Sequence, residues 1–179
     1  MKTIKRILLA LAAIIVLALV IALFIKKEYL IEREITINKP KIEVFEYIKY
    51  LKNQDNYSVW ASMDPDMIKE FRGTDATVGF ISAWESQNKS VGKGEQEIVK
   101  IDEGNRIDYE LRFVEPFEDK GNTYLITESL GDSSTKVRWG YSGKMNYPMN
   151  LMTLFMNMDK MLGPDLETGL SNLKTILEN

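Results

Sequence analysis

Apolar residues near the C-terminus recur at steps of three and four. Between Pro148 and Asn179 this spacing gathers them into one stripe, which is the pattern of an amphipathic helix. The stripe consists of Leu151, Phe155, Met158, Leu162, Leu166, Leu170, Leu173 and Leu177. Further apolar residues, mostly methionine, widen the stripe in its first half. The pattern predicts one long C-terminal helix around which the rest of the chain packs, with room for a void beside its first half.

The middle of the chain follows a period of two instead. Alternation in Tyr29–Ile37 predicts a first strand, Pro40 then begins a helix of about 12 residues, and a short helix or turn follows up to Met63. Six further strands are predicted at Met67–Arg72, Val78–Trp84, Gly94–Ile101, Arg106–Val114, Thr123–Leu130 and Lys136–Ser142. The breaks between them are short and rich in Gly, Asn and Asp, which favours hairpins and an antiparallel sheet.

An unbroken apolar run lies near the N-terminus. Ile7–Ile25 holds 19 residues without a charge, about 28 Å as a helix, which is close to the hydrocarbon thickness of a bilayer. Lysine or arginine flanks the run on both sides, and its end lacks a small-residue cleavage site. We expect an uncleaved, single-pass membrane anchor in residues 1–27, with a removed signal peptide as the alternative. The flanking charges narrowly favour an extracytoplasmic position for residues 28–179.

Charge and composition exclude several classes of function. The first 27 residues hold five basic and no acidic residues, whereas the remainder holds 18 basic and 26 acidic residues, a net charge of −8. An acidic domain without a basic stripe is a poor candidate for binding nucleic acid. The chain has no cysteine and no histidine, which removes thiol nucleophiles, the commonest general base and the commonest metal ligands. We therefore expect no metal and no cofactor, and any catalysis would use Asp, Glu, Lys or Tyr.

Several short motifs carry a resemblance to a known family. They are Ile35–Pro40 with Val44, Phe45 and Ile48, then Trp60, Gly92–Gly94, Val137–Trp139 and Gly169–Lys174. Together they resemble the START-like SRPBCC superfamily, in particular its polyketide cyclase/dehydratase-type branch, over most of Tyr29–Asn179. The resemblance implies an α+β helix-grip fold, in which a seven-stranded antiparallel sheet curls around the C-terminal helix. It also implies a cavity for an apolar or amphipathic ligand, but no shared set of catalytic residues.

Candidate ligand-binding residues come from both walls of the expected cavity. Unbranched methionine side chains adapt to ligands of different shapes, and aromatic side chains combine apolar surface with a few hydrogen-bond donors. The candidates are Met152 and Met156 on the helix, and Trp60, Trp84, Tyr109, Phe113, Trp139 and Tyr141 opposite it. For each of these residues, ordinary core packing is the alternative.

Asp159 is the most informative single position. On a helical wheel it lies with Phe155 and Met156 rather than with the polar residues. A carboxylate that pointed inward would be desolvated, its pKa would rise, and it could act as a general acid or a ligand contact. The alternative is a salt bridge at the edge of the sheet, for example to Arg112 or Arg138.

Three functions are compatible with this sequence. The first is a membrane-anchored module that binds a hydrophobic small molecule or lipid between the sheet and the C-terminal helix. The second is a polyketide cyclase/dehydratase-like enzyme for an aromatic or polyketide-type substrate, in which Asp159 and a tyrosine transfer protons. The third is a protein-interaction module that uses the outer face of the sheet. The sequence does not decide whether the protein is an enzyme, and the first function requires an incompletely filled interior.

Overall fold

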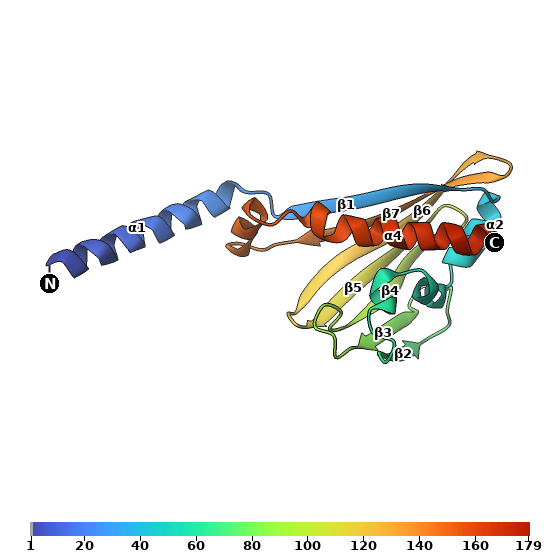
Figure 1. Cartoon of the computed structure of the whole chain (residues 1–179), viewed down its shortest axis with the longest axis horizontal. Coiled ribbons are helices and arrows are strands. Elements are labelled where there is room, and N and C mark those ends of the chain that lie inside the picture. Colours follow the sequence, from blue (N-terminus) through green and yellow to red (C-terminus); the bar gives the residue numbers. More distant parts are fainter. Residues whose placement is uncertain (1) are drawn as a thin grey trace.

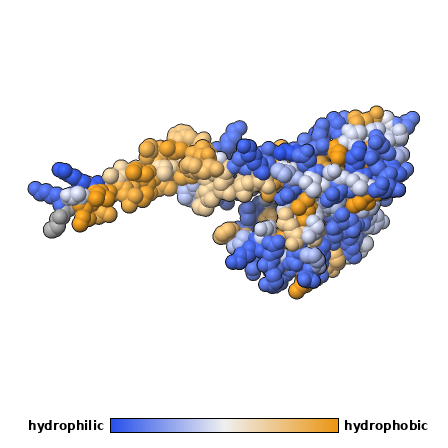
Figure 2. All heavy atoms as spheres, viewed as in Figure 1, coloured by the Kyte–Doolittle hydropathy of each residue, from blue (hydrophilic) through white to orange (hydrophobic). Residues whose placement is uncertain are grey.

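A long apolar helix projects from one end of the molecule (Figure 1). The computed structural model describes residues 2–179, and this helix, α1, spans Lys2–Phe24. Nearly all of its side chains are exposed, so that it forms an apolar rod in Figure 2, and Ala22 near its end is buried. By length and composition α1 is the one helix among the described residues that could cross a membrane.

The rest of the chain forms one curled antiparallel sheet. Its strands are β1 (Glu28–Ile37), β2 (Ile68–Arg72), β3 (Ile81–Glu85), β4 (Lys93–Asp102), β5 (Arg106–Glu115), β6 (Asp119–Gly131) and β7 (Ser134–Lys144). The seven strands lie in the order β1-β7-β6-β5-β4-β3-β2. The predicted seven-stranded antiparallel sheet is therefore confirmed. The predicted break between Val114 and Thr123 was wrong in its second half. Residues 119–122 pair with β5, and the chain turns at residues 116–118.

Short helices follow β1 and close one end of the curled sheet. They are α2 (Lys41–Ile48), the 3-10 helix η1 (Leu51–Asn56) and α3 (Val59–Ser62). Helix α2 is shorter than the 12 residues expected, because a new helical turn begins at Leu51. The carboxylate of Asp75 accepts hydrogen bonds from the backbone nitrogens of Leu51 (2.8 Å) and Lys52 (3.1 Å), which satisfies the free donors at the start of η1.

The C-terminal region contains two helices rather than the single helix predicted. A 3-10 helix, η2 (Met149–Leu154), packs against α1, and α4 (Met158–Glu178) lies in the concave face of the sheet. The chain bends between them because Asn157 caps α4, its side chain accepting a hydrogen bond from the Lys160 nitrogen at 3.1 Å. The predicted stripe is correct within α4, where Leu166, Leu170 and Leu173 are buried.

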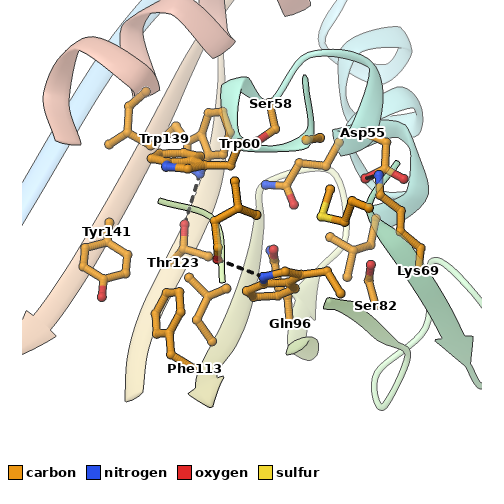
Figure 3. Close-up of a pocket in the computed structure, with 18 of the residues that line it drawn as sticks. Asp55, Ser58, Trp60, Lys69, Ser82, Gln96, Phe113, Thr123, Trp139 and Tyr141 are labelled. Atoms are coloured by element: carbon orange, nitrogen blue, oxygen red, sulfur yellow. Dashed lines mark hydrogen bonds and ion pairs between the residues drawn. The ribbon is translucent and has the colours of Figure 1, made fainter. Parts of the chain in front are cut away.

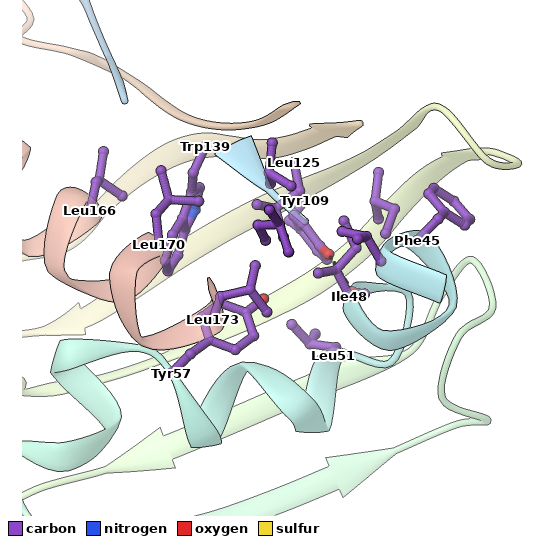
Figure 4. Packing of buried hydrophobic residues seen from close by; sticks show 14 of the residues in the cluster. Phe45, Ile48, Leu51, Tyr57, Tyr109, Leu125, Trp139, Leu166, Leu170 and Leu173 are labelled. Atoms are coloured by element: carbon purple, nitrogen blue, oxygen red, sulfur yellow. Dashed lines mark hydrogen bonds between the residues drawn. The ribbon is translucent and has the colours of Figure 1, made fainter. Parts of the chain in front are cut away.

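The core lies between α4, α2 and the strands (Figure 4). It contains the buried side chains of Phe45, Ile48, Tyr57, Ile98, Ile107, Tyr109, Leu125, Val137, Trp139, Leu166, Leu170 and Leu173, among others. This is the α+β helix-grip arrangement, with the core concentrated toward the α2 end of the molecule.

Candidate functional site

A cavity of about 280 Å³ lies between the curled sheet and α4. This volume is close to the lower end of the range typical of small-molecule sites, roughly 300–1,000 Å³. Figure 3 shows its aromatic wall, with Trp60, Phe113, Trp139 and Tyr141 around the open space. All three tryptophans of the chain line this cavity. Leu162 and Leu166 contribute the α4 side of the wall.

The strand period places these side chains in the cavity. Successive residues of a strand point to opposite faces, so that every second residue of β4, β5, β6 and β7 points inward. Inward residues toward the α2 end, such as Ile98 and Tyr109, are buried in the core. Inward residues toward the α1 end of the same strands, such as Gln96 and Phe113, line the cavity. Core and cavity are thus two halves of one continuous interior.

Two glycines make room for the aromatic wall. A Cβ atom on Gly94 would lie 2.7 Å from the indole of Trp84 and 2.6 Å from the carbonyl oxygen of Arg112. A Cβ atom on Gly121 would lie 2.5 Å from the hydroxyl of Tyr141. Any side chain at either position would push an aromatic ring out of its place. The shape of the cavity therefore depends on these two glycines.

One polar group inside the cavity has no partner. The side chain of Gln96 is 8% exposed, and its amide nitrogen is buried without a hydrogen-bond acceptor. Its neighbours are satisfied: Thr123 Oγ1 donates to the Gly140 carbonyl at 2.7 Å and accepts from Trp139 Nε1 at 3.0 Å. A buried donor without an acceptor costs about 1–3 kcal/mol. This nitrogen has almost no surface open to the cavity, so an oxygen atom of a bound molecule could accept the hydrogen bond only after the amide turns toward it.

Three titratable side chains line the cavity: Asp55, Lys69 and Tyr141. Lys69 Nζ lies 2.7 Å from Asp55 Oδ1, so the two charges form an ion pair. Burial raises the pKa of Tyr141 above its ordinary value, and the neighbouring Tyr29 adds to the shift. The phenol therefore stays protonated at neutral pH and offers a hydrogen-bond donor rather than a base.

The structure brings together five of the predicted ligand-binding residues. Trp60, Trp84, Phe113, Trp139 and Tyr141 all line the cavity. Whether they contact a ligand stays a prediction. Tyr109 does not line it, because it is fully packed in the core, where its hydroxyl donates to the Ile48 carbonyl at 3.5 Å.

The predicted methionine wall was wrong. Met152 lies on η2 and is exposed, and Met156 lines a separate, shallow cleft beside Tyr29. Neither residue reaches the cavity, because the chain bends before α4 begins. The helical wall of the cavity is instead made by Leu162 and Leu166.

The inward position predicted for Asp159 was also wrong. Its side chain is 57% exposed and forms a two-pronged ion pair with Arg33, with distances of 2.8 and 2.9 Å. The hydrogen bond from Arg33 lowers the pKa of Asp159, opposite to the rise expected for a buried acid. The alternative of a salt bridge is correct, but the partner is neither Arg112 nor Arg138. Arg112 binds three carboxylates on the outer face of the sheet, those of Glu95, Glu97 and Glu110.

The polar residues of the cavity were not predicted from the sequence. Gln96 could have been found, because it occupies an inward position of β4 between Gly94 and Ile98, and a polar residue in an inward register is unusual. The ion pair of Asp55 and Lys69 could not, since the two residues come from η1 and β2 and carry no periodic signal.

Comparison with known proteins agrees with this geometry. A family model described as polyketide cyclase/dehydrase and lipid transport matches residues 30–178. A comparison with curated proteins gave no match.

Several solved structures share the fold at low sequence identity. A protein from Chromobacterium violaceum is 14% identical with a TM-score of 0.58, over 84% of this chain and 97% of that chain. A protein from Thermobifida fusca is 17% identical with a TM-score of 0.56, over 83% and 92% of the two chains. Norcoclaurine synthase from Thalictrum flavum, in complex with dopamine and hydroxybenzaldehyde, is 9% identical with a TM-score of 0.62, over 84% and 86%. Because the family match covers nearly the whole sheet and all of α4, this protein belongs to the polyketide cyclase/dehydrase and lipid transport family.

Proposed function

We propose that this protein is a membrane-anchored module that binds a hydrophobic small molecule or lipid in the cavity between the sheet and α4. The observation that carries the proposal is an aromatic hollow of about 280 Å³ with one unpartnered amide. Apolar walls with a few placed polar groups are the usual composition of a small-molecule site. The family match, which includes lipid transport, supports the same class of function.

The lining limits the chemistry of the ligand. Aromatic and aliphatic side chains favour a compact, largely apolar body. The Gln96 amide and the Tyr141 hydroxyl are donors, so they favour a ligand with a carbonyl, carboxyl or ether oxygen. The charges of Asp55 and Lys69 are paired with each other, which leaves no free charge for a strongly ionic ligand among the described lining residues.

Helix α1 supports the membrane part of the proposal. It carries no charge from Ile7 to its end at Phe24, and β1 begins four residues after α1 ends. An extended chain of that length reaches about 14 Å at most. If α1 crosses a bilayer, the cavity therefore lies beside a supply of apolar molecules.

Native mass spectrometry of the full chain, released from detergent micelles, tests the ligand. We expect a co-purifying apolar molecule in the wild type and its loss in Leu162→Trp, which places a larger ring in the cavity. Thr168→Trp, on the exposed side of α4, is the matched control and should retain the molecule. A wild-type protein without any bound molecule, both as purified and after incubation with lipid extract, would contradict the proposal.

An enzyme is the second candidate, and the Asp55–Lys69 pair in the cavity wall favours it. Proton transfer by Asp159 is not compatible with its exposed position outside the cavity. Asp55 and Lys69 are the only acid and base that line the cavity among the described residues. If a bound molecule is chemically altered by the wild type but released unaltered by Asp55→Asn, the enzyme is the better description.

A further inference from the structure

The end of the molecule next to α1 carries large apolar side chains that point into solvent. Phe155 is 88% exposed and Phe117 is 81% exposed. We call the set the apolar collar, and it consists of Leu30, Phe117, Met149, Met152, Leu154 and Phe155, all exposed. Exposed apolar residues are normal when they are scattered singly, but a group of them marks an interaction site.

The strand register places Phe117 at the same end as the other members. Gly143 of β7 pairs with Tyr29 at the start of β1 and with Gly121 at the start of β6. The turn of residues 116–118 therefore lies at the same end of the sheet as the junction of α1 and β1, with β7 between the two strands, as Figure 1 also shows. Residues from three distant parts of the sequence thus lie at one end of the domain.

The collar is fixed to the end of α1. The side chain of Asn150 is fully buried, and its Nδ2 donates to the carbonyl oxygens of Ala22 (2.7 Å) and Ile25 (3.0 Å). The backbone nitrogen of Met145 donates to the Lys27 carbonyl at 2.8 Å. The Ala22 carbonyl is one of those that a helix leaves free at its C-terminal end. The collar residues on η2 are therefore held at the end of this helix.

The cavity opens at the same end. Trp84, Phe113 and Tyr141, from the α1 end of their strands, belong to its lining. Figure 2 shows a hollow beneath the first turns of α4, on the side that faces α1. The collar residues on η2 and on the turn of residues 116–118 lie at this end of the sheet.

We infer that the apolar collar lies in the interfacial layer of a lipid bilayer and holds the mouth of the cavity against it. The inference rests on the proposed membrane role of α1. Its basis is that the collar continues the apolar surface of α1, with Lys26 and Lys27 between them, where they can face lipid headgroups. The opposite end, at the β6–β7 turn, carries Asp132 and Ser133, with Leu130 as an exposed apolar neighbour. A ligand would pass between bilayer and cavity without crossing bulk water.

The absence of cysteine allows a direct test with single labels. An environment-sensitive fluorophore is attached to Phe117→Cys, Phe155→Cys, Leu17→Cys in α1, and Ser133→Cys at the opposite end. Each full-length variant is reconstituted in phosphatidylcholine vesicles, and quenching by nitroxide-labelled lipid is compared with quenching by aqueous iodide. We expect lipid quenching at positions 117, 155 and 17, and several-fold stronger iodide quenching at position 133.

Each remaining result overturns the inference. If the labels at 117 and 155 are as accessible to iodide as the label at 133 while position 17 is lipid-quenched, the collar inference is wrong and the membrane anchor stands. Iodide quenching at position 17 would remove the membrane part of the proposed function as well. Shielding of positions 117 and 155 from both quenchers would indicate contact with a second copy of this chain instead of lipid.

Discussion

The two ends of the space between sheet and α4 are built from the same strands but are filled differently. At the α2 end, Phe45 and Ile48 of α2 pack against Tyr109 and Leu173, and the interior is closed. At the α1 end no further helix of the described residues closes the space beside α4, because η2 contacts α1 instead. The alternation along a strand therefore predicts which residues point into the interior. Whether these residues become core or cavity wall depends on whether a helix such as α2 closes that end of the sheet.

The largest expected effect is a difference in stability between substitutions at the two ends. Leu170→Ala, at the closed end, should lower the free energy of unfolding by about 2–5 kcal/mol, because it leaves a void in close-packed surroundings. Leu162→Ala, at the cavity, should cost about 1 kcal/mol or less, since its side chain already borders open space. Urea unfolding followed by circular dichroism measures both, and equal losses would contradict the division into core and cavity.

A change at Gln96 should separate stability from binding. Gln96→Leu removes a buried donor without a partner, so that the free energy of unfolding should rise by about 1–3 kcal/mol. The same change should weaken the binding of an oxygen-bearing ligand about tenfold, the equivalent of roughly 1.4 kcal/mol. Gln54→Leu, another lining residue, is the control for general polarity. A less stable Gln96→Leu protein would show that the amide has a partner after all.

Alkaline pH should destabilise both ends through buried tyrosines. Burial raises the pKa of Tyr109 in the core and of Tyr141 in the cavity. Both stay neutral in the folded state above pH 10, where an unfolded tyrosine ionises. The free energy of unfolding should therefore be unaffected by these two groups below pH 10. Above pH 10 it should fall by up to about 1.4 kcal/mol per pH unit for each tyrosine.

The Tyr141→Phe variant measures how much of the alkaline loss of stability comes from the tyrosine in the cavity. It should change stability little at neutral pH and make the alkaline decline less steep. The decline is measured by thermal unfolding between neutral pH and pH 11, with tyrosinate absorbance as a second readout. An unchanged slope in Tyr141→Phe would indicate that Tyr141 ionises freely in the folded protein.

The smallest effect is expected at Asp159, outside both regions. Asp159→Asn should lower the melting temperature slightly and leave the bound molecule in place, because the residue pairs with Arg33 at the surface. Since the hydrogen bond from Arg33 lowers the Asp159 pKa, the contribution is present above the ordinary carboxyl pKa and is lost as the pH falls. Loss of the bound molecule in this variant would indicate that Asp159 takes part in binding after all.

Much of the fold follows from periodicity alone. The alternation of apolar and polar residues predicted all seven strands, and the stripe in α4 contains its three buried leucines, Leu166, Leu170 and Leu173, with Leu162 and Leu177 half-buried. The break before α4 could not be predicted in this way, because the stripe continues through Leu151 and Phe155 without losing its spacing. Asn157 caps the start of α4, and η2 before it is held against α1 by the hydrogen bond from Asn150 to Ala22, 128 residues apart in the chain.

The site was predictable to the same extent and for the same reason. The aromatic residues of the strands were placed inward by their period, and four of them reach the cavity, namely Trp84, Phe113, Trp139 and Tyr141. Predictions that placed residues on one unbroken helix through the bend before α4, those for Met152, Met156 and Asp159, were wrong together. Tyr109 has the correct orientation but lies too close to α2, a distance along the strand that alternation does not encode.

The arrangement of the three indoles has a practical consequence. Because the chain has no tryptophan elsewhere, all of its intrinsic tryptophan emission, excited apart from that of tyrosine, originates at the wall of a single cavity. A shift of this emission to shorter or longer wavelength therefore reports whether the cavity is apolar or hydrated, without any attached dye. Occupancy can be followed in real time in an unmodified sample.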